Sequence, residues 1–353
     1  MKILHVITLA ELGGAQSVVI NLAGKSIEQN HEVFVASSSH GEMWNVLHKD
    51  VHQIKLKNLH HAINVKDILV MNDLRNLYHE IKPDIIHLHS SKIGILGRLC
   101  FPKSKIIYTV HGFDSIRLRY RKFLPIEKAL KNRCKAIVGV SQYDTSNLLK
   151  EGIKDNVYLV RNGVKDFAAL DKEQDPENVL YKIKKDTGKK IILSISRLAP
   201  PKRFDLFCKV AEEFLESDYQ FVWIGNKENV SEIPENVIML GEIEDAHQYY
   251  QYADIALLLS DYEGLPISLI EALCYSKPII ASNVGGISEL LEENGALVSN
   301  ENLPEIVNSV SFILANQNIY EKFAQNSRQI FENKFTIGKM YEKYIHVYTQ
   351  NDK

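Results

Sequence analysis

Short apolar segments alternate with longer amphipathic ones from the start of the sequence. The short segments are rich in β-branched residues and nearly continuously apolar, which is typical of strands buried on both faces of a parallel sheet. The longer segments, such as 15–29 and 65–81, place apolar residues at helical spacing. The strands expected in the first half of the chain are 3–8, 32–37, 84–89, 106–111, 136–141 and 157–161. This alternation predicts an α/β fold built from βαβ units.

The alternation lapses between residues 162 and 190, where the chain is polar and charged, and this stretch is expected to be a linker with a short helix. The pattern then restarts, with expected strands at 190–196, 220–225, 237–240, 255–260 and 278–282 and helices at 204–215 and 267–275. The sequence therefore predicts two doubly wound, Rossmann-like domains facing across a cleft. We expect an N-terminal domain at 1–168, a C-terminal domain at 169–335 and a helix at 336–353 that returns to the first domain, because its aromatic residues have helical spacing.

Composition agrees with a two-domain protein. A chain of 353 residues is long for a single core. Hydrophobic residues make up 45% and charged residues 24%, a balance typical of soluble globular proteins. Four widely spaced cysteines lack metal-ligand or redox spacing, which favours reduced structural thiols. The first apolar run is too short for a secretion signal and no stretch has the length of a membrane span, so we expect a cytoplasmic protein.

The formal net charge of −2 hides an asymmetry between the halves. Residues 1–168 carry a net charge of +9 and the remainder −11. The densest basic segment, 117–135, interleaves basic and apolar residues. It is interpreted either as a surface for an anionic membrane or acceptor or as an ordinary solvated helix face. The first interpretation makes the protein peripheral on the inner face of the cell membrane, and it nominates Arg117, Arg119, Arg121 and Lys122.

In open α/β sheets, ligands bind outside the carboxyl ends of the strands, so residues that directly follow the expected strands are the candidates. Gly13 and Gly14 follow the first strand and precede a helix, where free backbone N–H groups attract anions. A simple strand-to-helix turn explains the two glycines equally well. Arg197 and Lys202 follow the strand that restarts the series, and together they could clamp a diphosphate. Loop cations that face only water are the competing interpretation.

Two glutamates flank the start of the helix expected at 267–275. Glu263 and Glu271 are eight residues apart, or roughly 10 Å along a helix axis. One carboxylate could accept sugar hydroxyls and the other ribose hydroxyls, while the amides of Gly264 and Leu265 meet the phosphates between them. An acid and base pair for glycoside hydrolysis is the alternative, but it requires the scissile bond to lie between the two carboxylates.

Histidines follow two neighbouring strands. His111 ends the strand expected at 106–111 and could hydrogen-bond the donor sugar or act on a proton near the reacting carbon. A buried structural histidine is the competing interpretation. His87 and His89 share one strand face, but no third ligand is evident nearby in the sequence, so we expect no metal site. No Asp-x-Asp carboxylate pair is present.

With these residues in place, the sequence resembles the retaining glycosyltransferases of family 4, which have the GT-B fold. The motifs occur in family order along nearly the whole chain: Gly13-Gly14-Ala15, Pro83 to His89, His111-Gly112, Val140-Ser141, Asn162 to Val164, Arg197 to Lys202, Glu263 to Pro266, Glu271-Ala272 and Gly285 to Glu289. The resemblance implies that Arg197 and Lys202 bind the diphosphate, that Glu263 contacts the donor sugar and that Glu271 contacts the ribose. It also implies that Gly13, Gly14 and His111 line the sugar side.

The resemblance further implies retention of anomeric configuration without a metal, with a nucleotide-diphosphate sugar as co-substrate, most simply a UDP-sugar, and no other cofactor. The implied acceptor is a saccharide or a polyprenyl-diphosphate-linked sugar of a bacterial capsule or O-antigen; no nucleic-acid partner is implied. The chain departs from the family at Ser196 and Arg203, where glycines are common, which leaves the role of Arg203 open. Two alternatives remain open on the same fold: a nucleotide-sugar 2-epimerase or phosphorylase, and a non-catalytic member that binds a partner.

Overall fold

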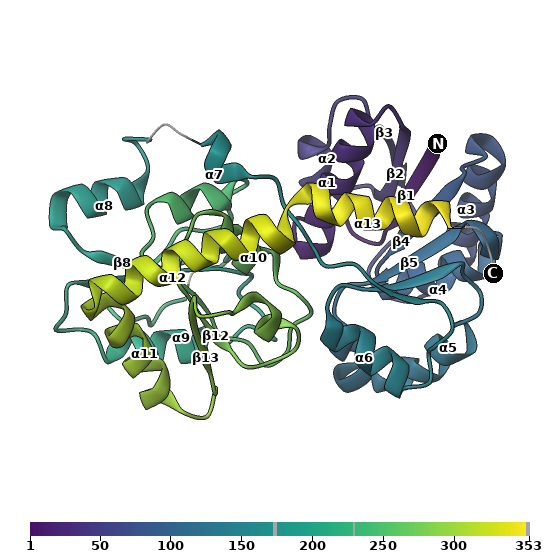
Figure 1. The fold of residues 1–353 in the computed structure, drawn as a ribbon. Coiled ribbons are helices and arrows are strands. Elements are labelled where there is room, and N and C mark those ends of the chain that lie inside the picture. Colours follow the sequence, from purple (N-terminus) through teal and green to yellow (C-terminus); the bar gives the residue numbers. More distant parts are fainter. Residues whose placement is uncertain (172–174, 229, 351–353) are drawn as a thin grey trace. The chain divides into compact units, whose positions relative to one another are not determined.

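The computed structural model describes residues 1–171, 175–228 and 230–350, and the chain divides into two compact units (Figure 1). The first comprises Met1–Gly163 with Ile337–Lys353, and the second comprises Val164–Thr336. The chain therefore passes from the first unit to the second after Gly163, five residues before the expected domain end at 168. Val164 forms an isolated bridge with Thr336, and the carboxylate of Asp166 accepts hydrogen bonds from Arg328, so these residues pack with the second unit.

A seven-stranded sheet forms the centre of the first unit, in the order β3-β2-β1-β4-β5-β6-β7 with every pair parallel. Its strands are β1 (Lys2–Ile7), β2 (Glu32–Ser38), β3 (His52–Leu56), β4 (Ile85–His89), β5 (Ile106–Val110), β6 (Ala136–Gly139) and β7 (Val157–Leu159). β4 and β5 are buried along their whole length, which is typical of central strands in a parallel sheet.

Helices cover both faces of this sheet. They are α1 (Gly14–Glu28), α2 (Met43–Val46), α3 (Asp67–Ile81), α4 (Ser91–Cys100), α5 (Leu124–Ala129), α6 (Gln142–Lys150) and α13 (Ile337–Thr349). Leu4 and Val6 of β1 pack in one hydrophobic cluster with residues of α3 and α4, whereas Ile7 packs with residues of α1 in another. Because side chains alternate across a strand, His5 lies on the same face as Ile7. α13 contacts α1 (Figure 1).

The second unit contains a six-stranded parallel sheet in the order β10-β9-β8-β11-β12-β13. Its strands are β8 (Lys190–Ile195), β9 (Tyr219–Ile224), β10 (Val237–Met239), β11 (Ile255–Leu258), β12 (Ile279–Ser282) and β13 (Gly295–Val298). Its helices are α7 (Phe167–Leu170), α8 (Val179–Thr187), α9 (Phe204–Glu212), α10 (Ile267–Cys274), α11 (Leu303–Ala315) and α12 (Gln317–Ile330). A core that includes Phe207, Phe221 and Trp223 joins sheet and helices.

The predicted α/β class with two Rossmann-like sheets is confirmed, and of the thirteen strands in the described residues eleven lie where the apolar segments predict them. The two missed strands give weak signals. β3 lies at an edge of its sheet and is mostly exposed, and β13 is only four residues long and begins with a glycine. All four cysteines are free thiols. Within the described ranges, no helix combines the length and apolarity needed to cross a bilayer.

The loop after β12 is packed tightly against the loop after β11. Gly285 has φ +59°, and a Cβ placed there would lie 1.8 Å from the carbonyl oxygen of Glu263. The neighbouring Gly286 donates its N–H to the carbonyl of Gly264 at 2.9 Å. Only a residue without a side chain permits both the left-handed backbone and this close approach. Gly285 therefore fixes the position of the segment that contains Glu263.

We expect Gly285→Ala to destabilise the protein more than Gly188→Ala. Gly188 also has a positive φ, +67°, but a Cβ placed at this position would meet nothing within 4 Å. The control therefore carries only the backbone cost of the left-handed region, about 1–2 kcal/mol, whereas Gly285→Ala adds a backbone clash. Urea denaturation of both variants measures the difference. Equal losses of unfolding free energy in the two variants would show that the loops after β11 and β12 can move apart without an energetic cost.

Candidate active site

Lys202 and Glu263 meet beyond the carboxyl ends of β8 and β11. Backbone pairing between Lys202 and Ser260 brings the two loops together, and the Lys202 ammonium forms an ion pair with the Glu263 carboxylate. Both side chains are largely buried, with 15% and 13% of their surfaces exposed. An ammonium has three donors, so Lys202 retains hydrogen-bonding capacity for a further anion.

The two arginines of the same loop differ in their surroundings. Arg197 is exposed, and its guanidinium forms no ion pair with any described residue. Arg203 donates to Asp205 at 2.7 Å and to Asp261 at 3.2 Å, and the first of these bonds raises its pKa. The guanidinium of Arg203 is thus engaged by two aspartates. Of these two arginines, Arg197 is the one whose guanidinium remains available to a ligand.

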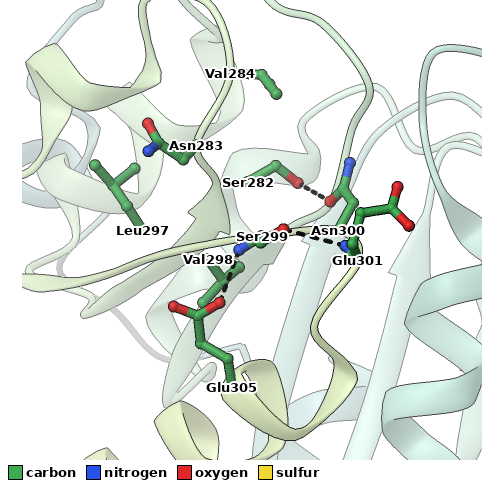
Figure 2. Close-up of a pocket in the computed structure, with 9 residues that line it drawn as sticks. All are labelled: Ser282, Asn283, Val284, Leu297, Val298, Ser299, Asn300, Glu301 and Glu305. Atoms are coloured by element: carbon green, nitrogen blue, oxygen red, sulfur yellow. Dashed lines mark hydrogen bonds between the residues drawn. The ribbon is translucent and has the colours of Figure 1, made fainter.

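A side-chain network holds the start of the loop that contains Glu263. Ser282 accepts a hydrogen bond from the backbone of Ser260 at 2.9 Å and donates to Asn300 at 2.6 Å, and Asn300 donates back to the carbonyl of Ser260 at 2.9 Å. Beside this network lies a pocket of about 360 Å³. Figure 2 shows its lining: Ser282, Asn283, Val284, Leu297, Val298, Ser299, Asn300, Glu301 and Glu305. This lining contains carboxylates and no basic residue, so the pocket does not suit a diphosphate.

Glu271 lies on α10, whose first turn has no side-chain cap. The helix begins at Ile267, as expected, and its first N–H groups lack an intrahelical acceptor. Burial raises the pKa of Glu271 to about 8. No ion pair or hydrogen bond to its carboxylate occurs within the described part of the chain. Glu271 is therefore a protonated, unpartnered acid at neutral pH, a state that partners donating hydrogen bonds to the carboxylate would reverse.

In the first unit, Gly13 and Gly14 form the start of α1. Gly13 is its N-cap with extended backbone angles, and no side chain caps the helix. The loop before the helix is held by Gln16, which donates to the carbonyl of Leu9 at 2.8 Å. Gly41, with φ +140°, allows the neighbouring loop to approach Ala10 so closely that a Cβ would lie 2.2 Å from the Ala10 carbonyl carbon. The N–H groups at the start of α1 are accordingly held in place beside the end of β1.

His111 directly follows β5, in the position that the sequence predicts. Its ring is half-buried, and desolvation lowers its pKa to about 4. Its Nε2 atom is 3.2 Å from Nδ1 of His89. The next turn is fixed by Asp144, which accepts a hydrogen bond from the backbone N–H of Phe113 at 2.7 Å. His111 is thus a neutral imidazole at physiological pH, held through one ring nitrogen.

His5 lies beside His87 and His89 as a third histidine that the sequence analysis did not identify. His5 of β1 pairs in register with His87 of β4, so their side chains share one face. The three buried rings have ligand atoms within 4.8 Å of one another, a spacing that could hold a metal ion. However, both nitrogens of His87 already bond Tyr348 and Thr109. Both nitrogens of His89 also hydrogen-bond other histidine rings, so a metal would have to break these bonds.

The basic segment is less uniformly charged than its sequence suggests. Arg117 lies 2.7 Å from the buried carboxylate of Asp114. Arg121 lies 3.5 Å from Glu151, whereas Lys122 extends over the ring of Phe123. The one acid inside the segment, Glu127, is buried in an ion pair of 2.5 Å with the fully buried Arg98. Arg119 is exposed and its guanidinium lies over the ring of Tyr120. The apolar side chains of Leu118 and Ile126 are also exposed.

Three of the contacts just described were beyond the reach of the sequence. These are the Lys202 pair with Glu263, the aspartates that hold Arg203 and the third histidine of the buried cluster. In the second unit, Lys202 and Glu263 are in direct contact, and Arg197 and Glu271 belong to the same unit. Gly13, Gly14 and His111 belong to the first unit. His5 is placed beside His87 only by the register between β1 and β4, which the sequence does not record.

Comparisons with known proteins agree with this geometry. Residues 12–166 match the family model described as Glycosyltransferase Family 4, and residues 176–330 match that of Glycosyl transferases group 1. The O-antigen biosynthesis glycosyltransferase WbnH of Escherichia coli is 30% identical over 312 residues, which cover 84% of this chain and 85% of WbnH.

A second Escherichia coli relative, the UDP-Gal:alpha-D-GlcNAc-diphosphoundecaprenol alpha-1,3-galactosyltransferase, is 25% identical over 99% of this chain and 96% of its own. The crystal structure of Anabaena HepE in complex with UDP-glucose superposes with a TM-score of 0.84 at 18% identity, covering 98% of both chains. Together with the two sheets and the residues at their strand ends, these matches show that the chain belongs to the family 4 glycosyltransferases, which have the GT-B fold.

Proposed function

We propose that this protein transfers a hexose or N-acetylhexosamine from a UDP-sugar to a saccharide or lipid-linked acceptor during the synthesis of a bacterial cell-surface polysaccharide. The transfer retains the anomeric configuration and needs no metal. The names of the Escherichia coli relatives support the acceptor class, since one acts in O-antigen biosynthesis and another on a diphosphoundecaprenol-linked sugar. The UDP-glucose complex of HepE supports the donor class.

The observation that carries this proposal is the Lys202 and Glu263 pair at the carboxyl ends of two neighbouring strands. The ammonium can bind a β-phosphate oxygen while its ion pair orients the Glu263 carboxylate. Glu263 then accepts hydrogen bonds from sugar hydroxyls. Arg197 neutralises the diphosphate from the exposed side, and the amides of Gly264 and Leu265 precede the uncapped helix α10 that receives the phosphates.

The reaction breaks the bond between the sugar C1 and the β-phosphate oxygen. The acceptor oxygen forms its bond to C1 on the same face, and the acceptor proton passes to the departing phosphate oxygen. Negative charge on the phosphate grows as the bond breaks, so Lys202 and Arg197 stabilise the transition state more than the ground state. The family resemblance assigns His111 and the amides at Gly13 and Gly14 to the donor sugar as well.

Lys202→Ala is expected to lower kcat/KM by roughly 10²–10³-fold, the effect of removing one group that stabilises transition-state charge. The adjacent Arg203→Ala serves as the matched control, because Asp205 and Asp261 already engage that guanidinium; we expect less than roughly threefold change. UDP release from a panel of UDP-sugars, with a polyprenyl-diphosphate-linked saccharide as acceptor, measures both variants.

Reactions without acceptor separate the alternatives. A nucleotide-sugar 2-epimerase would interconvert the donor in the absence of any acceptor, whereas the proposed transferase requires one. Equal turnover by the Lys202 variant and the wild type would rule out the assigned phosphate site.

Binding of UDP is expected to strengthen with pH because of Glu271. In the free protein this carboxyl stays protonated until its pKa of about 8. Ribose hydroxyls that donate to it favour the ionised form, so binding releases a proton and the affinity rises as the pH increases from 6 to 9. In Glu271→Gln this dependence is lost. Titration calorimetry with UDP at several pH values checks this, and the titration of the UDP phosphate itself cancels between the two proteins.

The same raised pKa fixes the sign of an effect on stability. Glu271 holds its proton longer in the folded than in the unfolded protein, so folding is progressively disfavoured as the pH rises between the ordinary value of 4.5 and about 8. Glu271→Gln should therefore gain stability relative to the wild type across that window. A constant difference between the two proteins from pH 5 to pH 9 would contradict the assignment of a protonated Glu271.

We also propose that the basic segment, residues 117–135, binds the anionic inner leaflet of the cell membrane. A lipid-linked acceptor would be held in that leaflet. Leu118 and Tyr120 are 55% and 43% exposed and are flanked by Arg119, Arg121 and Lys122. Exposed apolar and basic side chains in this combination suit the interface of an anionic bilayer. Arg117 contributes less, because Asp114 offsets its charge.

Lys122→Ala is expected to weaken binding to phosphatidylglycerol vesicles about fivefold, since one basic side chain near an anionic surface contributes about 1 kcal/mol. Lys57→Ala, which removes an exposed lysine elsewhere in the first unit, should leave binding unchanged. Vesicle co-sedimentation at physiological salt measures both, with phosphatidylcholine vesicles as the uncharged reference. Equal binding to the two lipids would contradict the proposed membrane contact.

A further inference from the structure

Three histidine rings form a hydrogen-bonded chain from the interior of the first unit to its site residue. Nδ1 of His5 lies 3.0 Å from Nε2 of His89, and Nδ1 of His89 lies 3.2 Å from Nε2 of His111. β1 and β4 are paired, and β4 is paired with β5, so the rings occupy adjacent strands. His5 and His89 are completely buried, whereas His111 is half-buried.

All three rings are neutral at physiological pH. Burial lowers the pKa of His5 to about 3, that of His111 to about 4 and that of His89 well below its ordinary value. A neutral imidazole has one N–H and one lone pair. Each bond between two rings therefore needs an N–H from one and a lone pair from the other, so the protons of the whole chain must all point in the same direction.

The inner end of the chain selects that direction. Nε2 of His5 is buried and has no hydrogen-bond partner among the described residues. A proton there would be an N–H donor without an acceptor, a rarer defect in folded proteins than an acceptor without a donor. The proton of His5 is therefore on Nδ1 and is donated to His89. His89 in turn donates its own Nδ1 proton to Nε2 of His111.

We propose that His5 and His89 are positioning residues that hold His111 in the tautomer with its proton on Nδ1, so that His111 can donate a hydrogen bond to a ligand oxygen but cannot accept a proton. The lone pair of His111 is occupied by the bond from His89, and its Nδ1–H group is left for the ligand. This inference rests on the proposed role of His111 at the sugar. It selects hydrogen-bond donation over general-base action for that ring.

The direct test is the tautomeric state of His111 in the full-length protein. Long-range ¹H–¹⁵N correlation spectra of ¹⁵N-histidine-labelled protein at neutral pH distinguish a protonated from an unprotonated ring nitrogen, and His111→Ala, His89→Leu and His5→Leu assign the signals. We expect His5, His89 and His111 all to carry their proton on Nδ1. A proton on Nε2 of His111 in the wild type would overturn the inference, as would a metal ion bound stoichiometrically to the purified protein.

Substitution of His5 tests the direction of influence. His5→Leu removes the donor that orients His89, so His111 should populate both tautomers, and kcat/KM for the donor should fall roughly two- to tenfold, the loss of about one hydrogen bond. His5→Asn supplies a side-chain N–H₂ close to the position of Nδ1 and should restore the wild-type spectrum and rate. An unchanged His111 signal in His5→Leu would contradict the proposed chain. If that variant does not fold, the spectrum of the wild type decides alone.

The spectra need no substrate, so they separate this inference from the proposed function. A protein without transferase activity in which His111 carries its proton on Nδ1 would refute the proposed function and leave the histidine chain intact. An active transferase in which His111 carries its proton on Nε2 would do the reverse.

Discussion

Parallel strand pairing is the constraint on which the assigned chemistry depends. When every strand of a sheet runs in the same direction, all carboxyl ends share one edge, and loops far apart in sequence become neighbours there. Lys202 and Glu263 are 61 residues apart, yet they form an ion pair because β8 and β11 are adjacent. In the first unit, the parallel register of β1 and β4 likewise brings His5 beside His87, 82 residues away. Neither contact requires a specialised local motif, only the correct order of strands.

The fold could be predicted from the sequence where burial dominates local pattern. β11 and β12 are apolar over nearly their entire length and are buried on both faces, so their positions follow from the apolar pattern alone. β3 could not be found in this way, because an exposed edge strand does not need an apolar sequence. The candidate site was predictable to the extent that its residues lie in the segments after strands: His111 directly follows β5, and Glu263 lies between β11 and α10. The partners of those residues were not, since no periodicity records that Arg203 meets Asp261.

Glycine positions illustrate the same limit. The sequence places Gly285 and Gly286 in a family motif, but their physical role becomes visible only from the contact with the carbonyl of Glu263. That contact makes the loop after β12 a support for the loop after β11. The network of Ser260, Ser282 and Asn300 supports the same loop from a second direction. The acidic side chain therefore starts from a backbone that is already fixed, which reduces the entropy lost when a ligand binds.

Charge pairing bears on how the proposed diphosphate site is compatible with an acidic unit. The second unit has 16 basic and 28 acidic residues, an excess that would repel a diphosphate if it acted uniformly. Screening limits each charge to about 8 Å at physiological ionic strength, so the nearest groups decide the local potential. Near the site, Arg203 holds Asp205 and Asp261, and Lys202 holds Glu263. Glu271 carries no charge at neutral pH because burial raises its pKa to about 8. The acids closest to the proposed diphosphate are thus paired or protonated, and Arg197 has no ion pair within the described ranges, so its charge remains available to an anion.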